Sequence, residues 1–271
     1  MIVRLTLAYH GGGFSGWAAQ PGLRTVEDEL VAALERILQV PVRLTVAGRT
    51  DAGVHAWAQV ASFALPKPLP DRLAQRVNAV APGDLAVLAA DRVADGFDAR
   101  RDARSRTYCY RVLASDVRSP FEDGRALWWP YPIEPKLLRR CAELLPGTHD
   151  FTAFTPTQTE HVRFERNILR AEWVREHGTN SPGADARASE AQDQSGEAER
   201  AKAEQPGGIC FWIEADAFMR HMVRVLVGTM LEVAGGTRGV EDFGALLDGA
   251  PREAAGETTP PWGLYLASVA Y

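Results

Sequence analysis

The sequence has few cysteines, few lysines and no apolar run long enough to cross a membrane. It lacks a run of roughly 18 consecutive apolar residues, which excludes a transmembrane helix. The three cysteines, Cys109, Cys141 and Cys210, are scattered, which argues against a disulfide framework or a metal site and favours a reducing compartment. The chain begins directly with a strand pattern instead of a signal peptide, so we expect a cytoplasmic protein.

The shortage of lysine leaves arginine as the main cation. Of the 30 basic residues only Lys67, Lys136 and Lys202 are lysines, and the planar guanidinium of arginine suits bidentate phosphate contacts. The net charge of −5 argues weakly against a nucleic-acid partner. Charge is local, however, because residues 100–111 contain a single acid, Asp102, among five arginines: Arg100, Arg101, Arg104, Arg106 and Arg111. This basic stripe predicts contact with RNA.

The remaining pattern predicts an α+β fold. The first half favours the order β-α-β-β-α-β-β, with strands at 3–9, 42–46, 59–64, 85–93 and 105–113 and helices at 26–37 and 72–80. The second half predicts helices at 135–145 and 218–230 and strands at 168–176, 210–214 and 261–271. We expect a mostly antiparallel sheet with helices on one face, in two ferredoxin-like or RRM-like halves around a central cleft.

The predicted halves are an N-terminal part, residues 1–114, which carries a polar loop at residues 46–56, and a C-terminal part, residues 115–271. Residues 178–207 are dominated by Gly, Ser, Ala, Gln and Glu and lose their apolar anchors. Such a stretch cannot bury enough apolar surface to offset its ordering entropy, so we expect a flexible insertion there and assign no function to it.

The segment 46–56 gathers several polar side chains between two predicted strands: Arg49, Thr50, Asp51 and His55, bracketed by Gly48 and Gly53. Loops on a rigid scaffold often carry binding or catalytic residues. The same residues also suit a plain turn, in which Asp51 caps a backbone N–H and Arg49 is solvated. The residues alone leave both interpretations open.

The segment Gly48-Arg49-Thr50-Asp51-Ala52-Gly53-Val54-His55 resembles the signature of the TruA-type tRNA pseudouridine synthases. Further similar segments follow in the family's order: 9–17 (with His10 in place of Asp), 97–100 (with Asp98 in place of His), 106–110, 147–154, 222–228 and 261–271. The resemblance implies conversion of uridine to pseudouridine at positions 38–40 of the tRNA anticodon stem-loop. It also implies a homodimer, with the tRNA spanning both subunits, and no cofactor or metal.

The resemblance also implies roles for single residues. Asp51 is the nucleophile, Arg224 pairs with it, Tyr108 stacks on the flipped base, and Leu264 packs in the active site. Burial raises the pKa of a carboxyl group, so a buried nucleophile needs a fixed arginine to stay charged. Arg49 would fill the space vacated by the base or hold a phosphate.

Several alternatives stay open. Tyr108, Tyr110 and Arg106 share one face of a strand, as either a stacking surface or a core face with Arg106 at its rim. Arg220 and Arg224 are four residues apart on a predicted helix and would by pattern alone form a solvated face. Two other functions of the whole protein also stay open: an RNA-binding module without catalytic activity, and a glycoside hydrolase. A glycoside hydrolase needs two neighbouring carboxylates.

Overall fold

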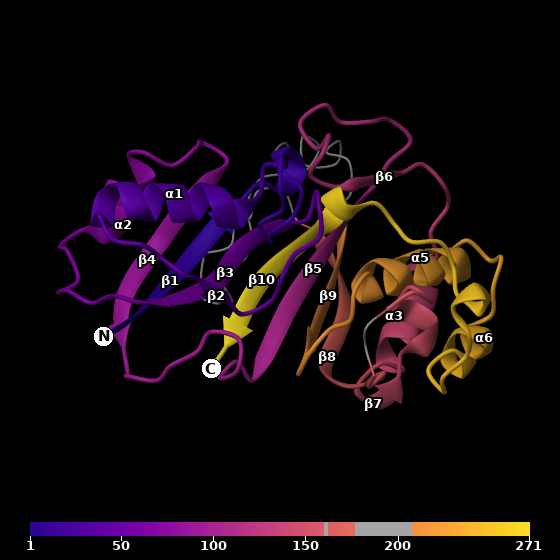
Figure 1. Cartoon of the computed structure of the whole chain (residues 1–271). Helices are drawn as coiled ribbons and strands as arrows, with labels where there is room; N and C mark the ends of the chain where they lie inside the picture. Colours follow the sequence, from indigo (N-terminus) through magenta and orange to yellow (C-terminus); the bar gives the residue numbers. More distant parts are fainter. Residues whose placement is uncertain (160–161, 177–207) are drawn as a thin grey trace, which may run out of the picture.

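The computed structural model describes residues 1–159, 162–176 and 208–271. The whole of the predicted insertion at 178–207 therefore lies outside the described residues. In the described part, ten strands form one sheet in the order β4-β1-β3-β10-β5-β9-β8-β7, with β2 paired to β3 and β6 to β5 (Figure 1). The strands are β1 (Ile2–Tyr9), β2 (Thr45–Val46), β3 (His55–Ala64), β4 (Leu85–Val93), β5 (Ser105–Ala114), β6 (Leu127–Trp129), β7 (Gly147–Asp150), β8 (Glu165–Glu176), β9 (Gly208–Ala215) and β10 (Leu264–Ala270).

The sheet is mixed but mostly antiparallel, as the sequence predicts. Only the pairs β10–β3 and β5–β6 run parallel among the strand pairs of the described residues. The last strand, β10, lies between β3 and β5, so the end of the chain pairs with two strands of the first half. The catalytic-loop candidate, which directly precedes β3, is thereby fixed next to C-terminal residues.

The helices pack on one face of the sheet. They are α1 (Val26–Leu38), α2 (Leu73–Asn78), α3 (Pro135–Glu143), α5 (Met222–Ala234) and α6 (Val240–Ala245). Along β9, Phe211 and Ile213 join the core beneath the helices, whereas Cys210 and Trp212 point to the opposite face. Figure 1 shows α1 and α2 over the β4 end of the sheet and α3, α5 and α6 at the other end. The predicted α+β class with a mostly antiparallel sheet is therefore confirmed.

Helix α1 shows how the sequence sets these elements. The Oγ1 of Thr25 accepts a hydrogen bond of 3.2 Å from the backbone N–H of Asp28, which satisfies one of the free donors at the helix start. Val26, Leu30 and Leu34 then recur on one side and are buried against the sheet. The helix predicted at 26–37 is confirmed, and Thr25 is its N-cap.

Several predicted boundaries are wrong, and the starts of β3, β2 and α5 differ most clearly. Strand β3 begins at His55 instead of residue 59, because His55 and Ala56 pair with Tyr265 and Leu266 of β10, a partner that no local pattern reveals. β2 is correspondingly short, only Thr45–Val46.

Helix α5 begins at Met222 instead of residue 218, because His221 has a left-handed backbone with φ of 63° that no α-helix contains. Arg220 therefore precedes the helix and does not share a helix face with Arg224. No helix in the described ranges is long and apolar enough to span a membrane.

Candidate active site

The loop that carries Asp51 is fixed from beneath by three buried polar side chains. The Nε2 of Gln59, in β3, donates to the carbonyl of Gly48 at 2.7 Å and to the hydroxyl of Tyr9 at 3.3 Å. The hydroxyls of Tyr9 and Thr50 are 2.8 Å apart. Burial raises the pKa of Tyr9 to about 12, so its hydroxyl stays protonated and available to the network. These contacts hold the residue immediately before Asp51.

The glycine-rich segment 11–17 packs on the other side of this loop. The backbone N–H of Trp17 donates to the carbonyl of Thr50 at 3.0 Å. Gly16 has a φ of +94°, and a Cβ there would lie 2.9 Å from the carbonyl oxygen of Thr50, so only glycine fits this approach. Phe14 and Trp17 are buried. Residues 11–17 therefore pack against the Asp51 loop and restrict its movement.

Of the two glycines that bracket the loop, only Gly53 has a left-handed backbone. Gly53 has a φ of +80°, which a residue with a side chain resists. Gly48 is not in the left-handed region; a Cβ there would be 3.9 Å from the Tyr108 hydroxyl, an ordinary contact. Gly48 therefore needs neither the backbone freedom nor the small size of glycine.

His55 serves the fold beside the site. Its Nδ1 accepts from the backbone N–H of Gly11 at 2.9 Å, and its Nε2 lies 3.0 Å from the carbonyl oxygen of Trp262. Its ring stacks on Tyr265 and is 1% exposed. Burial lowers the pKa of His55 to about 4, and the neighbouring His10 acts in the same direction. His55 is thus a neutral connector between the glycine-rich segment and the start of β10.

Asp51 faces two side chains from the C-terminal half. The Nη1 of Arg224 lies 3.8 Å from Oδ2 of Asp51, and the Nε2 of His221 lies 3.5 Å from the same oxygen. The side chain of Asp51 is 35% exposed, so the carboxylate is more open than the sequence analysis expects. The pairing of Arg224 with Asp51 brings together residues from the two ends of the chain.

Arg224 is held by the segment that leads into β10. Its Nε donates to the carbonyl of Thr259 at 2.7 Å, and the N–H and Oγ1–H of Thr259 both donate to the carbonyl of Arg224. Burial lowers the pKa of the Arg224 guanidinium while the charge of Asp51 opposes the shift, and arginine stays a cation in either case. The guanidinium therefore faces Asp51 as a fixed positive charge.

Tyr108 and Tyr110, two residues apart on β5, have different surroundings. Tyr110 is fully buried, and its hydroxyl donates to the carbonyl of Pro260 at 2.8 Å. The ring of Tyr108 packs edge-on against Phe218, with centroids 4.9 Å apart. Burial raises the pKa of Tyr108, and Tyr9 and the charge of Asp51 act in the same direction. A Cβ at Gly48 would lie 3.9 Å from the Tyr108 hydroxyl, so this tyrosine is next to the loop. Tyr110 is a core residue, whereas Tyr108 borders the Asp51 loop.

Leu264 is the first residue of β10 and is 7% exposed. It lies opposite Tyr110 in the pairing of β10 with β5. Arg49, next to Thr50 in the loop, is exposed and has no side-chain hydrogen bond or ion pair within the described residues. Leu264 is therefore a buried apolar residue of the sheet, and the Arg49 guanidinium has no partner among the described residues.

Arg106 is not the phosphate-binding residue that the basic stripe predicts. Its guanidinium donates to four backbone carbonyls, those of Ala47, Arg100, Ala103 and Asp216. All of its donors are thus used inside the protein, and the prediction for this residue is wrong. Arg100, Arg101 and Arg104 are exposed, and their contact with RNA stays a prediction.

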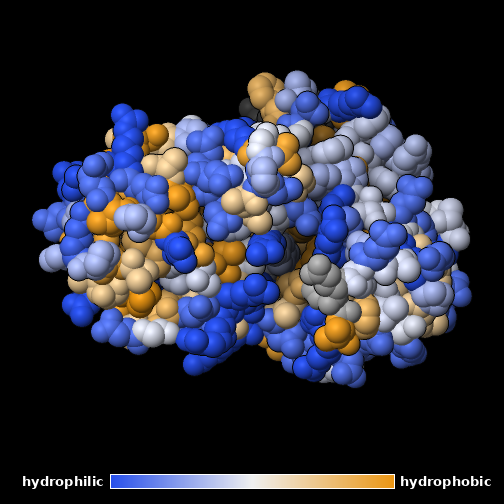
Figure 2. Space-filling view, viewed as in Figure 1, coloured by the Kyte–Doolittle hydropathy of each residue, from blue (hydrophilic) through white to orange (hydrophobic). Residues whose placement is uncertain are grey.

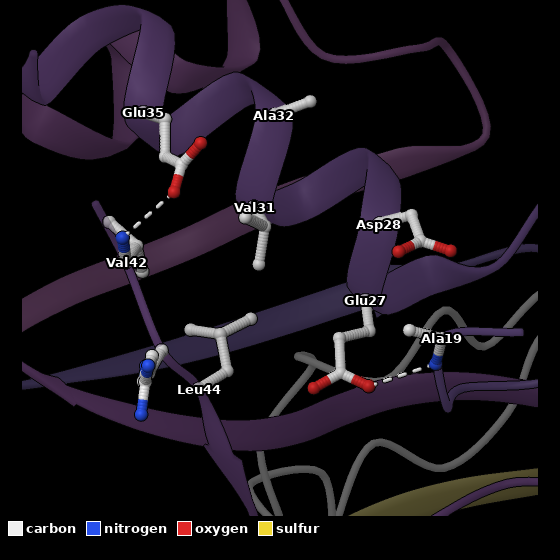
Figure 3. Close-up of a pocket in the computed structure, with 9 residues that line it drawn as sticks. Ala19, Glu27, Asp28, Val31, Ala32, Glu35, Val42 and Leu44 are labelled. Carbon is white, nitrogen blue, oxygen red and sulfur yellow. Dashed lines mark hydrogen bonds between the residues drawn. The ribbon is translucent and has the colours of Figure 1, made fainter. Parts of the chain in front are cut away.

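The surface is hollowed over the middle strands, between the α1 side and the α5 side, and hydrophilic residues border the hollow (Figure 2). A separate shallow depression of about 360 Å³ lies between α1 and residues 42–44, and its lining contains none of the predicted site residues (Figure 3). There Glu35 accepts from the backbone N–H of Val42 and Glu27 from that of Ala19, so these carboxylates serve the fold. Within the described residues no cluster of His, Cys, Asp and Glu suits a metal ion.

Sequence reasoning missed three residues that shape the site: His221, Thr259 and Gln59. Gln59 lies in a strand pattern, and Thr259 in a segment without a motif, so neither gives a local signal. His221 directly precedes the similar segment 222–228, and this adjacency was the available signal.

Known proteins are similar to this chain over most of its length. A family model described as tRNA pseudouridine synthase matches residues 141–271. A tRNA pseudouridine synthase A of Geobacillus sp. (strain WCH70) is 33% identical over 271 residues, covering 99% of this chain and 98% of that protein. A tRNA pseudouridine synthase A of Myxococcus xanthus is 37% identical over 274 residues, covering 99% and 91%.

Among solved structures, the crystal structure of a Cbf5-Nop10-Gar1 complex aligns with 97% of this chain and 57% of that chain, at 12% identity and a TM-score of 0.36. The sequence relatives cover nearly the whole chain, including the Asp51 loop and the Arg224 helix. The chain belongs to the tRNA pseudouridine synthase A family.

Proposed function

We propose that this protein isomerises uridine to pseudouridine in the anticodon stem-loop of tRNA, at positions 38–40, without a cofactor or metal. The observation that carries the proposal is the placement of Arg224 opposite Asp51, 3.8 Å from its Oδ2. Membership of the family supports the same activity. The reaction breaks the N1–C1′ bond of uridine, turns the base and joins C5 to C1′, while a proton leaves C5 and N1 gains one.

Asp51 is proposed as the nucleophile. The reaction needs an ionised carboxylate near C1′ and C6 of the uridine. A fixed cation beside a carboxylate favours its charged form, and Arg224 is held in place by Thr259 for this purpose. The buried network of Tyr9, Thr50 and Gln59 fixes the loop, which limits the reorganisation needed to reach the reactive geometry.

Three further residues are proposed to bind the target nucleotide. A uridine in a stem-loop must leave its stack, which costs a few kcal/mol. The ring of Tyr108 would stack on the flipped base, and Leu264 would contact it through its apolar side chain. Exposed and unpaired within the described residues, Arg49 would fill the vacated space or hold a phosphate.

The domain division and the partners are part of the proposal. We infer two ferredoxin-like halves, residues 1–114 and 115–271, around a cleft to which the first contributes Asp51 and the second Arg224. The hollow in Figure 2 and the contact between these residues support a shared cleft. We also propose a cytoplasmic homodimer, with tRNA spanning both subunits and the exposed arginines near residue 100 contacting its phosphates.

The activity test uses an unmodified tRNA transcript with uridines at 38–40 and a matched transcript with cytidines there. After incubation with the protein, pseudouridine is mapped by carbodiimide-dependent primer-extension stops. Stops at 38–40 in the first transcript alone support the proposal. Binding without conversion would instead indicate an RNA-binding module, and turnover of a sugar substrate without RNA would indicate a glycoside hydrolase.

A further inference from the structure

We propose that His221 is a positioning residue for Asp51, holding its Oδ2 together with Arg224 so that Oδ1 is presented to the uridine. This inference rests on the proposed function and deepens it. The Nε2 of His221 and the Nη1 of Arg224 approach one carboxylate oxygen, at 3.5 Å and 3.8 Å. Within residues 1–159, 162–176 and 208–271, Oδ1 of Asp51 accepts no hydrogen bond, and both His221 and Arg224 approach the carboxylate most closely at Oδ2.

The backbone of His221 supports a role outside the helix. His221 is the N-cap of α5 but makes no side-chain capping bond, although capping is what Ser, Thr, Asp or Asn does at this position. Its φ of 63° and ψ of −5° lie in the left-handed region, which is costly for a residue with a Cβ. A strained residue that does not serve its helix, and whose side chain faces a reactive carboxylate, fits strain stored at a functional site.

Burial is the main cause that favours the neutral form of the imidazole. Burial lowers the pKa of His221; Arg224, Arg220 and Arg252 act in the same direction, and Asp51 opposes them. A neutral ring with its proton on Nε2 donates toward Asp51 without adding a second positive charge. Arg224 then supplies the positive charge beside Asp51, and His221 fixes the orientation of the carboxylate.

The test compares three variants of the full-length protein with wild type, using the tRNA transcript of the activity assay. His221→Gln keeps an N–H donor near the place of Nε2, and it keeps the strain of a side chain at positive φ. His221→Ala keeps that strain but removes the donor. His221→Gly removes the donor and relieves the strain, because glycine populates positive φ readily.

We expect kcat to fall about tenfold or more in the Ala and Gly variants, with the KM for tRNA within about threefold of wild type. We expect the Gln variant to stay within about fivefold of the wild-type kcat, because its donor remains. Thermal unfolding of each variant is measured in parallel, and the Gly variant is expected to be at least as stable as the Ala variant.

A purely structural role makes a different prediction, in which kcat follows stability across the series. A Gly variant with wild-type kcat, or a Gln variant as slow as the Ala variant, would overturn the inference while the proposed function stands. A wild-type protein that forms no pseudouridine would instead refute the proposed function, and this inference with it.

Discussion

Arg224 reaches Asp51 from the opposite half of the chain, with Nη1 3.8 Å from Oδ2, while its own Nε is bonded to Thr259. The pair joins the loop before β3 to the first turn of α5, and the insertion of β10 between β3 and β5 links these distant parts of the chain. The proposed chemistry depends on this relationship.

Arg224→Ala should lower kcat by at least about tenfold, equivalent to about 1.4 kcal/mol of transition-state stabilisation, because Asp51 loses its fixed counter-charge. Arg224→Lys should be intermediate, since lysine keeps the charge but lacks the second donor that bonds Thr259. The matched control is Arg220→Ala, an exposed arginine that precedes α5. Single-turnover kinetics measure all three; equal losses in the two alanine variants would contradict a specific role for Arg224.

Gln59→Leu should slow turnover by disordering the Asp51 loop from below. The change removes the donor to the Gly48 carbonyl and to the Tyr9 hydroxyl and leaves buried polar groups without partners. The expected loss of stability is about 1–3 kcal/mol, measured by urea unfolding. Tyr9→Phe, which keeps the ring and removes only the hydroxyl between Gln59 and Thr50, should have a smaller effect of the same sign. Unchanged stability and kcat in both variants would show that the network does not hold the loop.

Changing Arg100 and Arg104 together to Gln should weaken tRNA binding and flatten its dependence on salt by about one unit of slope per lost phosphate contact. Both residues are exposed. Arg106→Gln is the matched comparison, because the guanidinium of Arg106 donates its hydrogen bonds to backbone carbonyls of the protein. It should cost on the order of 2 kcal/mol of stability and leave the salt slope unchanged in the folded protein. The tRNA affinity of each variant is measured by titration at several salt concentrations. If the salt dependence of binding changes in the Arg106 variant and not in the Arg100 and Arg104 variant, then Arg106 and not the exposed pair contacts phosphate.

His55 should make stability depend on pH. Its pKa is lowered to about 4 from 6.5, so the unfolded chain takes up this proton first as the pH falls. The contribution is present above pH of about 6.5 and is lost as the pH falls toward about 4, with a ceiling of about 3 kcal/mol. Urea unfolding at pH 7 and pH 4.5 should therefore show a smaller pH effect in His55→Asn than in wild type or in His149→Asn. Equal pH effects in all three proteins would show that His55 does not carry this linkage.

The sequence predicts the order of elements in the first half well, because those strands and helices have clear local periods. It misplaces the start of α5, since Met219 is buried like a helix residue although it lies in the preceding loop. It misplaces the start of β3 because His55 pairs with Tyr265, a remote partner. Local patterns also cannot show that Arg106 meets carbonyls from distant segments.

Some residues of the site could likewise be predicted from the sequence, and others could not. Asp51 and Arg224 were identified through short segments similar to a family, and the structure brings them together. His221 and Thr259 owe their positions to a left-handed backbone and to a contact between distant segments, neither of which leaves a periodic signal.

The most direct test of the central claim is the rate of pseudouridine formation by Asp51→Asn. Asparagine keeps the shape and most hydrogen bonding of Asp51 but removes the charge, and circular dichroism verifies that the variant is folded. We expect no pseudouridine, with tRNA affinity within about tenfold of wild type, or about 1.4 kcal/mol, because phosphate contacts dominate binding. A folded Asn variant that converts uridine at a measurable fraction of the wild-type rate would contradict the assignment of Asp51 as the nucleophile.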